Sequence, residues 1–433
     1  MSRVLNRLGQ QIRSLLNLGF FHIVGAGTIN RIISTLLSIV LVRVLSKYEY
    51  GVYSYAYNIV SYFVIINGLG ATSAALQLCC ECYRDQERSR SIFGYSFRVS
   101  LIVGTAFLTL IAISAAIVPL SIPEAAPLLL LYCAYPLLQQ LCDIKTTEFR
   151  IKLDNRSYAL ATNIQTVLLC ICSITGAFLG GAAGLAIGQS IALLLTFLWL
   201  MMPSLHRSSS LYFRRVSHAD IIQFWKIALI SAFNNGISQA LTLLGTTLVG
   251  IISANELIVS SYKVATTVPF ALLFVPGAIA TFIYPYFVRN KDNYSWTRKN
   301  YQLLTCWSVV SMGCITAFFY LFAEPVILSI FGEQYLDAVP VFRVLLIGFF
   351  LTASFRTPTG NLLVTQRRLV SNTIIGVASI VVCVVGSYVL IPAYGMLGAA
   401  IVYDLCMLIG SVLTVLDYCH LLASKKQGEC CND

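Results

Sequence analysis

The chain has 433 residues, of which 58% are hydrophobic and only 11% are charged, and its mean hydropathy is +0.79. Soluble globular proteins carry about 25% charged residues. The composition therefore excludes a soluble globular protein and predicts an all-α polytopic membrane protein. The net charge of +11 does not indicate a nucleic-acid partner, because the basic residues stand in small groups between apolar runs, as in cytoplasmic loops.

The N-terminal segment 3–18 predicts a helix that lies in the membrane interface. Val4, Leu8, Ile12 and Leu15 share one face of this helix, and the arginines lie elsewhere on it. The apolar run that follows has no small-residue cleavage site. It is therefore expected to remain in the membrane as the first span and not to be removed as a signal peptide.

Apolar runs of about 20 residues predict membrane-spanning helices. About twelve such runs are present, which leaves only short loops and no room for a soluble domain. Their boundaries are at roughly 20–45, 51–78, 94–118, 125–142, 158–178, 182–202, 221–252, 257–288, 302–322, 339–361, 371–391 and 396–418.

The distribution of charge predicts the orientation of these spans. Most basic residues lie between spans on the side of the N-terminus, whereas the predicted outer loops hold only Lys47. Lysine and arginine mark cytoplasmic loops, so both termini are predicted to be cytoplasmic. The expected domains are an N-terminal lobe 1–202, a cytoplasmic lobe linker 203–220, a C-terminal lobe 221–420 and a cytoplasmic tail 421–433.

The two halves of the chain look like copies of one unit. A shift of 207 positions lays Leu45, Ser46, Glu49 and Tyr55 over Ile252, Ser253, Glu256 and Tyr262, and a shift of 214 lays the segment from Gly181 over that from Gly395. Each copy begins on the same side of the membrane, so the repeats are parallel. We expect two six-helix lobes related by a pseudo-two-fold axis along the membrane normal, a layout that places substrate between the halves.

Prolines predict kinks in two spans, at Pro136 in the fourth and at Pro269, Pro276 and Pro285 in the eighth. Bent helices suit a transporter, although kinks made for packing alone are an equal alternative. The fourteen cysteines are expected to be reduced, since none lies in a predicted outer loop. No second cysteine pair or nearby histidine joins the Cys-x-x-Cys at position 79, so no metal or other cofactor is expected.

Arg31, Lys263 and Arg356 are cations placed within spans. A charge at mid-bilayer costs about 2.5–3.5 kcal/mol on insertion scales and normally faces a partner, a cavity or a ligand. Asp404 is the only acid placed deep in a span, and one acid cannot neutralise three bases. We therefore predict a cavity with surplus positive charge that attracts an anionic substrate. Asp404 is either an ion-coupling carboxylate or a structural partner of Arg356 or Arg31.

Polar stripes on the first and seventh spans suggest further contacts, although small polar residues also pack helix against helix. The first stripe contains Gly27, Arg31, Ser34 and Ser38, and the second runs from Asn234 through Ser238 and Thr242 to Gly245. Tyr57 is either part of an interfacial tyrosine belt or a ring on which a sugar stacks. The candidate substrate-binding residues are Arg31, Lys263, Arg356, Asn235, Gln239 and Tyr57, the candidate ion-coupling residue is Asp404, and no catalytic residue is expected.

Three segments carry a family resemblance: residues 45–53 (LSKYEYGVY), 331–338 (FGEQYLDA) and 390–400 (LIPAYGMLGAA). By the order and spacing of these three segments, the chain resembles the polysaccharide transporters of the multidrug/oligosaccharidyl-lipid/polysaccharide exporter superfamily, in particular bacterial O-antigen flippases. Ser46 stands where the family often has glycine. The cationic cavity residues of the family follow no strict motif, so the resemblance extends to Arg31, Lys263 and Arg356 only as cavity cations.

The resemblance implies a V-shaped bundle in the bacterial inner membrane. Such a protein moves a polyprenyl-pyrophosphate-linked oligosaccharide from the cytoplasmic to the periplasmic leaflet by alternating access, driven by an ion gradient or the membrane potential. Its partners would be this lipid-linked sugar, the bilayer, and a polysaccharide polymerase with its chain-length machinery.

Two other functions fit the sequence less well. A multidrug extruder of the same fold predicts an acidic cavity for cationic drugs, whereas the charges within these spans lean basic. A membrane polymerase or glycosyltransferase is disfavoured because the longest predicted outer loop is only 323–338 and no Asp-x-Asp metal-sugar motif is present. The sequence also lacks a phosphate-binding loop for ATP hydrolysis.

Overall fold

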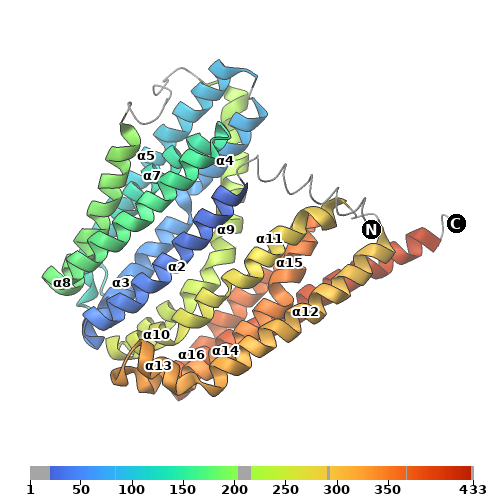
Figure 1. The fold of residues 1–433 in the computed structure, drawn as a ribbon. Coiled ribbons are helices and arrows are strands. Elements are labelled where there is room, and N and C mark those ends of the chain that lie inside the picture. Colours follow the sequence, from blue (N-terminus) through green and yellow to red (C-terminus); the bar gives the residue numbers. More distant parts are fainter. Residues whose placement is uncertain (1–19, 83, 203–215, 290–292, 367, 431–433) are drawn as a thin grey trace. The chain divides into compact units, whose positions relative to one another are not determined.

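The computed structural model describes residues 20–82, 84–202, 216–289, 293–366 and 368–430. Over these ranges the chain forms helices joined by short connections, and no β-strand is found (Figure 1). The predicted interfacial helix 3–18 and most of the predicted linker 203–220 lie outside these ranges. The chain forms two compact units, Met1–Gly236 and Ile237–Asp433, and each is described by itself.

The first unit contains the helices of the predicted N-terminal lobe and the start of α9. Helices α3 and α4 together form one broken span, as do α6 and α7. The elements are α2 (Phe20–Val44), α3 (Lys47–Ile65), α4 (Asn67–Glu81), α5 (Gln86–Ile117), α6 (Ala125–Tyr132), α7 (Tyr135–Ile151), α8 (Asn155–Met201) and the first part of α9 (His218–Ser253).

The second unit begins within α9 and repeats this order of elements. A 3₁₀ turn, η1, precedes α14, and a π-helical turn, η2, joins α14 to α15. The elements are α10 (Glu256–Leu272), α11 (Phe274–Arg289), α12 (Tyr294–Leu321), α13 (Ala323–Ile330), η1 (Glu333–Ala338), α14 (Val339–Leu351), η2 (Thr352–Arg356), α15 (Thr357–Thr365) and α16 (Leu369–Cys430).

Helix α9 packs against the first unit at its start, which moves the boundary between units beyond the predicted linker. Asp220 forms a 2.6 Å salt bridge with Arg88, and the indole Nε1 of Trp225 donates to the Tyr95 hydroxyl at 3.0 Å. These contacts place the start of the predicted C-terminal lobe, residues 221–236, with the first unit.

Helix α8 is a hairpin of two spans. Its 47 residues are about twice what one crossing needs, and the backbone turns at Gly181, which has φ 55° and ψ −139°. Gly176 and Gly184 lie backbone against backbone, so closely that a Cβ on either would collide with the other's carbonyl. The two halves therefore run antiparallel through a glycine contact.

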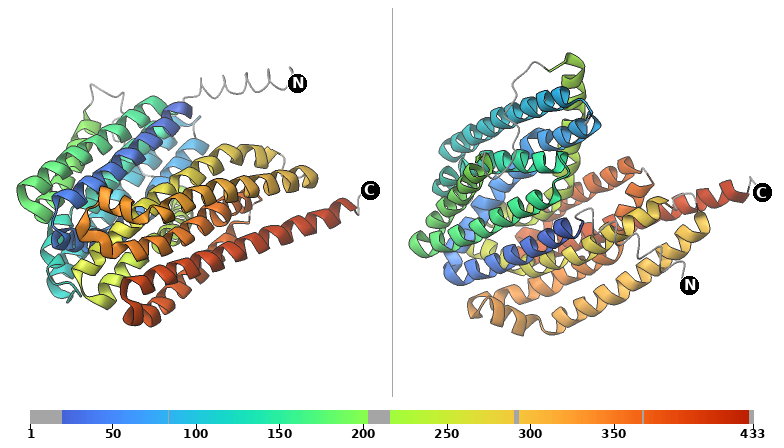
Figure 2. Two further views of the ribbon diagram at one scale, coloured as in Figure 1. Left: turned by 60° about the horizontal axis from the view of Figure 1, so that its bottom comes forward. Right: turned by 45° about the horizontal axis from the view of Figure 1, so that its top comes forward.

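Helix α16 repeats this hairpin in the second unit. It has 62 residues and turns at Gly395, with φ 57° and ψ −136°, and Gly398 packs directly on the carbonyl of Leu390. The fold-back of the red C-terminal helix is visible in Figure 2. The match between Gly181 and Gly395, 214 positions apart, confirms the predicted equivalence at the end of each repeat.

We expect Gly395→Ala to destabilise the protein by about 1–3 kcal/mol, because its φ and ψ lie in a region that essentially only glycine adopts. Apart from the adjoining backbone, no heavy atom of the described residues lies within 4 Å of the position of the missing Cβ, so the cost is backbone strain and not a clash. Thermal unfolding of the purified protein in detergent measures the effect. Gly180→Ala is the control, since Gly180 has φ −147° and the same open surroundings. Equal melting temperatures for the two variants would refute this account.

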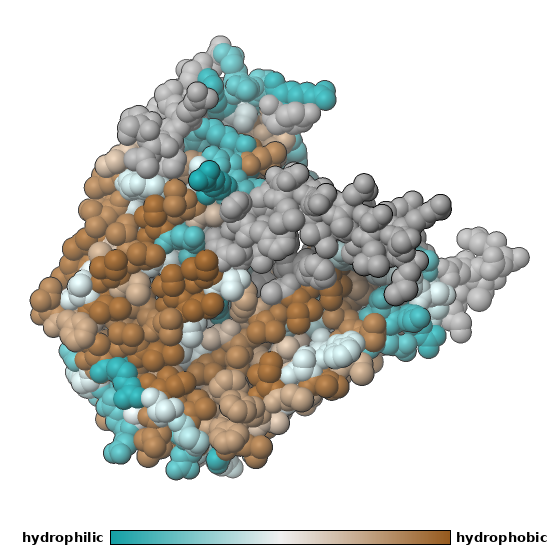
Figure 3. Space-filling view, viewed as in Figure 1, coloured by the Kyte–Doolittle hydropathy of each residue, from teal (hydrophilic) through white to brown (hydrophobic). Residues whose placement is uncertain are grey.

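The number of spans agrees with the prediction. In the described ranges, nine helices, or ten with the bent α9 counted as one span, are long and apolar enough to cross a membrane. Two of them are the hairpins α8 and α16, which brings the number of crossings to twelve. Large apolar side chains such as Leu179 at the tip of α8 are exposed. Figure 3 shows brown, apolar surface along the helices and teal, polar surface at helix ends, as lipid contact requires.

The first copies of the repeat do not align as predicted. Ser46 caps α3, and Asn255 caps α10, so the equivalent positions are 209 apart and not 207. The shift of 207 aligns Glu49 with Glu256, but these glutamates occupy different positions in their helices. Glu49 is the third helical residue and completes a capping box with Ser46, whereas Glu256 is the first residue of its helix. The predicted overlay of Ser253 on Ser46 is therefore wrong.

The predicted break of the eighth span is confirmed, since α10 ends at Leu272 and α11 begins at Phe274, between Pro269 and Pro276. Pro136 lies in the first turn of α7, where proline is tolerated. A further break, at Gly68–Gly70 in the second span, was not predicted. All three residues there have positive φ.

Candidate functional site

Arg356 ends the π-helical turn η2, a type of irregularity that is frequent at functional sites. Its Nη1 donates to the Ser379 hydroxyl of α16 at 3.1 Å. The guanidinium lies against Gly410 on the second half of α16, where any Cβ would collide with it. The Arg356 guanidinium therefore occupies space that is available only because position 410 is a glycine.

Lys263 lies near the middle of α10 and is half-buried. Its carbonyl accepts hydrogen bonds from the hydroxyls of Thr266 and Thr267, at 2.8 and 2.9 Å. Within the described part of the chain, neither Lys263 nor Arg356 forms an ion pair with an acid. The second unit thus contains two membrane cations that no carboxylate neutralises in these ranges.

Asp404 lies on α16, and its carboxylate occupies the space left by Gly348 of α14. Its Oδ1 is buried without a hydrogen-bond partner among the described residues. No ion pair with Arg356 is formed there. Two roles were predicted for Asp404, an ion-coupling carboxylate and a structural partner of Arg356 or Arg31. The geometry does not favour a structural pair with Arg356.

Arg31 lies exposed on α2 in the first unit. The hydroxyl of Thr35 donates to the carbonyl of Arg31 at 2.8 Å, and that of Ser38, in the same stripe as Arg31, donates to the carbonyl of Ser34 at 3.0 Å. Asn235 and Gln239 are exposed on α9, one in each unit. The six candidate substrate residues are thus divided between the units, three in each.

Tyr57 belongs to a cluster of tyrosines inside the first unit. Its ring stacks on Tyr53 at a centroid distance of 5.6 Å and meets the edges of Tyr132 and Tyr135 at 5.8 Å. Its hydroxyl lies 3.4 Å from that of Tyr135. One face of the ring is therefore already covered, which favours a packing role over stacking on a sugar.

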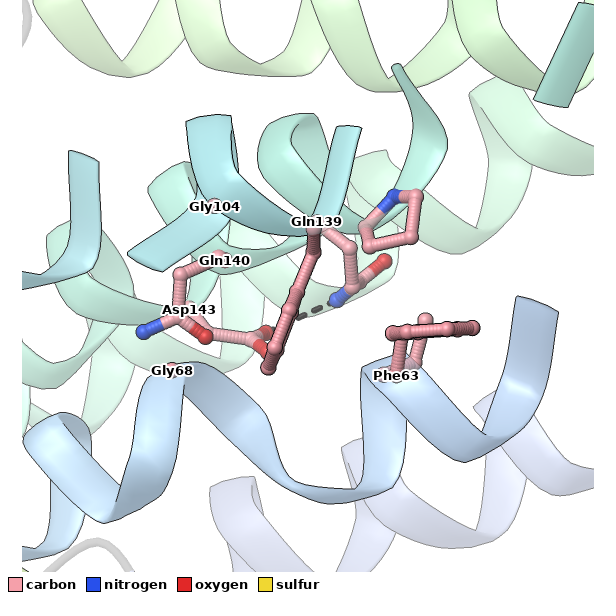
Figure 4. Close-up of a pocket in the computed structure, with 9 residues that line it drawn as sticks. Phe63, Gly68, Gly104, Gln139, Gln140 and Asp143 are labelled. Carbon is pink, nitrogen blue, oxygen red and sulfur yellow. Dashed lines mark hydrogen bonds between the residues drawn. The ribbon is translucent and has the colours of Figure 1, made fainter. Parts of the chain in front are cut away.

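Asp143 is a second carboxylate within a membrane helix, and the sequence analysis missed it. The fourth span was predicted to end at 142, but α7 continues to Ile151, so Asp404 is not the only acid in a span. The carboxylate accepts from Gln139 Nε2 at 2.8 Å (Figure 4). Gln139 in turn accepts from Gln165 Nε2 at 3.0 Å. The spacing of four between Gln139 and Asp143 was the signal that could have revealed this face.

A buried ion cluster lies further along α7. Glu148 binds Lys145 at 3.0 Å and Lys152 at 2.7 Å, and the side chain of Lys145 is only 4% exposed. Because both bonds are made within α7 and its C-terminal cap residue, this cluster is suited to a structural role.

Comparison with known proteins places this arrangement in a family. A family model described as polysaccharide biosynthesis protein matches residues 40–340. No curated protein sequence matches the chain.

Among solved structures, an inward-facing multidrug resistance MATE transporter of the MOP superfamily superposes with a TM-score of 0.77 at 14% identity, covering 92% of this chain and 96% of that one. The lipid II flippase MurJ, in an inward closed conformation, gives a TM-score of 0.77 at 15% identity, covering 92% of this chain and 87% of that one. A MOP-superfamily transporter from Pyrococcus furiosus, described as having a binding pocket of reverse polarity that suggests a different function, gives a TM-score of 0.66 at 15% identity, with coverage of 94% and 96%. Identities this low show the fold alone. By the family match and the shared fold together, the chain belongs to the polysaccharide biosynthesis protein family and has the fold of the MOP-superfamily transporters.

Proposed function

We propose that this protein is a flippase that moves a polyprenyl-pyrophosphate-linked oligosaccharide, such as an O-antigen repeat unit, from the cytoplasmic to the periplasmic leaflet. The family match and the fold shared with a lipid II flippase support this proposal. The observation that carries it is the pair of membrane cations Lys263 and Arg356, which no acid neutralises within the described ranges.

These cations would bind the negatively charged diphosphate of the substrate. A diphosphate carries negative charge that hydrocarbon excludes, and a hydrated path lined with cations lowers the barrier to its passage. Arginine can bind phosphate oxygens with two parallel hydrogen bonds, while lysine acts as a mobile point charge. We assign pyrophosphate binding to Arg31, Lys263 and Arg356 jointly, with Asn235 and Gln239 as further substrate contacts.

Transport in one direction also needs a driving force. An inside-negative potential favours outward movement of an anionic headgroup by about 2.3 kcal/mol per charge per 100 mV, and exchange with an inward-moving ion would add to this. We assign Asp404 as an ion-linked carboxylate of this exchange. Alternating access between the two halves would carry the substrate across.

A multidrug extruder is the second candidate function. It is favoured by one observation, namely that Asp143 and Asp404 are membrane carboxylates without an ion pair in the described ranges. An enzymatic role is disfavoured because the predicted outer loop 323–338 folds as α13 and η1. The latter docks on α10 through Tyr335 with Ser260 and Asp337 with Ser261, at 3.2 and 2.7 Å.

The experiment that tests the function uses proteoliposomes that contain a fluorescent polyprenyl-pyrophosphate oligosaccharide. A flippase makes the inner-leaflet label accessible to an added quencher, and a lipid carrier without the sugar serves as the control substrate. Efflux of a cationic dye with no movement of the lipid-linked sugar would instead establish the multidrug function.

We further propose that the protein resides in the bacterial inner membrane with both termini cytoplasmic and works beside a polysaccharide polymerase and its chain-length machinery. The distribution of basic residues supports this orientation. A reporter fused after Arg215 is expected to be cytoplasmic, and one fused near Glu333 periplasmic. Either reporter on the opposite side would overturn the orientation.

A further inference from the structure

A groove in the first unit leads along α4 and α7 to Asp143, and its lining becomes mostly polar where it narrows. Its wide end has a volume of about 650 Å³ and is lined by Gln77, Cys80 and Glu81 of α4. The groove continues into a narrower hollow of about 230 Å³, and Asp143 is one of the residues that line it. Both parts are bordered by Arg150.

Beyond Asp143, at the break between α3 and α4, only a tight gap remains, without room for a water molecule. Figure 4 shows Asp143 and Gln139 of α7 facing Gly68 of α4, with Phe63 of α3 beside them. A Cβ at Gly68 would collide with the Gln140 amide, so the broken helix and the amides of α7 close this end. The path therefore narrows from open space to a carboxylate and stops there, which suits a small ion better than a sugar.

The lining of the narrow hollow is mostly polar, and the residues that contribute to it include three threonines and Asp143. The Thr72 hydroxyl is buried, with the residue 7% exposed, and has no hydrogen-bond partner among the described residues. The Thr146 and Thr147 hydroxyls donate to the carbonyl of Asp143, at 3.0 and 2.8 Å, so their oxygens can still accept. One carboxylate surrounded by neutral oxygens is a ligand set for a hard cation.

The charged and titratable groups around Asp143 leave its carboxylate unpaired in the described part of the chain. Arg150 lies over the ring of Tyr158, at 5.6 Å from its centroid, and forms no ion pair with Asp143 there. From α3 and α5 the hollows are lined only by groups that do not titrate. The titratable lining groups are Cys80 and Glu81 from α4, Arg150 from α7 and Tyr158 from α8, and Tyr135 and Cys142 lie near Asp143 on α7 itself.

We propose that Asp143 and Thr72 form a binding site for a monovalent cation, either H⁺ or Na⁺, which reaches the carboxylate through this groove. The wide end lies beside the basic residues that mark the expected cytoplasmic side, so the site exchanges its ion with the cytoplasm. The proposal deepens and rests on the proposed transport function, to which it adds a coupling site in the first unit, separate from Asp404. A bound cation would neutralise a carboxylate that is otherwise costly within the membrane.

The test measures the melting temperature of the purified protein in detergent, in NaCl or in choline chloride of equal ionic strength. Sodium is expected to raise the melting temperature of the wild type, since a ligand of the folded state stabilises it. Asp143→Asn is expected to lose this increase in melting temperature with Na⁺. Thr72→Val is expected to need an about tenfold higher Na⁺ concentration for the same increase, because it loses one interaction with a charged ligand. Thr72→Val removes a hydroxyl without an internal partner, so a merely structural role would leave the response unchanged. Thr175→Val, on the exposed face of α8, is the matched control.

A second arm distinguishes the proton from sodium. If the ion is H⁺, the melting temperature of the wild type depends on pH but not on Na⁺, and Asp143→Asn removes part of that dependence while Asp404→Asn leaves that part intact. Equal responses of the wild type, Asp143→Asn and Thr72→Val to both Na⁺ and pH would overturn the proposal. Since no lipid-linked sugar is used, failure here leaves the flippase assay unaffected, and failure of that assay leaves this result standing.

Discussion

Replacing Lys263 or Arg356 with glutamate is expected to reduce surface polysaccharide by about tenfold or more, because a hydrogen bond to a charged group contributes about 1.5–3 kcal/mol. Neither side chain has an acidic partner within the described ranges, so the loss would fall on the substrate and not on an internal salt bridge. The measurement is surface polysaccharide in cells that lack the native gene, together with the amount of membrane-inserted protein. Arg31→Glu belongs to the same series.

Conservative and remote variants separate a phosphate contact from general damage. Arg356→Lys keeps the charge but loses the planar donors, so it is expected to retain part of the activity. Arg298→Glu changes an exposed arginine at the start of α12, whose Nη1 bonds the Tyr294 hydroxyl at 3.1 Å, and is expected to export normally. Wild-type polysaccharide from well-inserted glutamate variants at positions 31, 263 and 356 would show that these cations do not serve the substrate.

The helices and their number could be predicted from the sequence because each depends on a local property. Long apolar runs predict spans whatever their neighbours are, and the eighth span breaks where its prolines predicted. The equivalence of Gly181 and Gly395 could also be found, because both turns need the same positive-φ backbone that glycine adopts freely.

Other features depend on packing between distant segments, which local patterns do not record. Three consecutive residues at Gly68–Gly70 adopt positive φ, and Gly70 there meets the carbonyl of Ala228 from α9. The repeat register failed for a related reason, since different residues cap equivalent helices, serine in one copy and asparagine in the other.

The cations of the candidate site could be predicted from the sequence, but not which of them would form ion pairs. A lysine or arginine in an apolar run is plain in the sequence, whereas the absence of an ion pair between Arg356 and Asp404 depends on where α14 and α16 meet. Asp143 was missed because it follows directly on an apolar segment and was assigned to a loop. Only the continuation of α7 brings its carboxylate beside the break of the second span.

Replacing Glu148 with alanine is expected to destabilise the protein by about 3–5 kcal/mol, the usual cost of removing one partner from a buried ion pair. Glu148 is bound by Lys145 at 3.0 Å and by Lys152 at 2.7 Å, and the side chains of Glu148 and Lys145 are 6% and 4% exposed. Removing the carboxylate leaves the buried ammonium of Lys145 without this anion. The measurement is the thermal unfolding of the purified variant in detergent against that of the wild type.

Two further variants show whether the loss comes from the buried charge. The double variant Lys145→Met with Glu148→Leu removes both buried charges and is expected to recover most of the lost stability, since apolar replacement of a whole buried pair is often neutral or stabilising. Glu81→Ala removes an exposed glutamate that accepts from Gln77, at 3.0 Å, and surface changes of this kind usually stay within about 0.5 kcal/mol. If Glu148→Ala melts no lower than Glu81→Ala, or if the double variant is less stable than Glu148→Ala, the ion cluster does not stabilise α7 in the way its geometry implies.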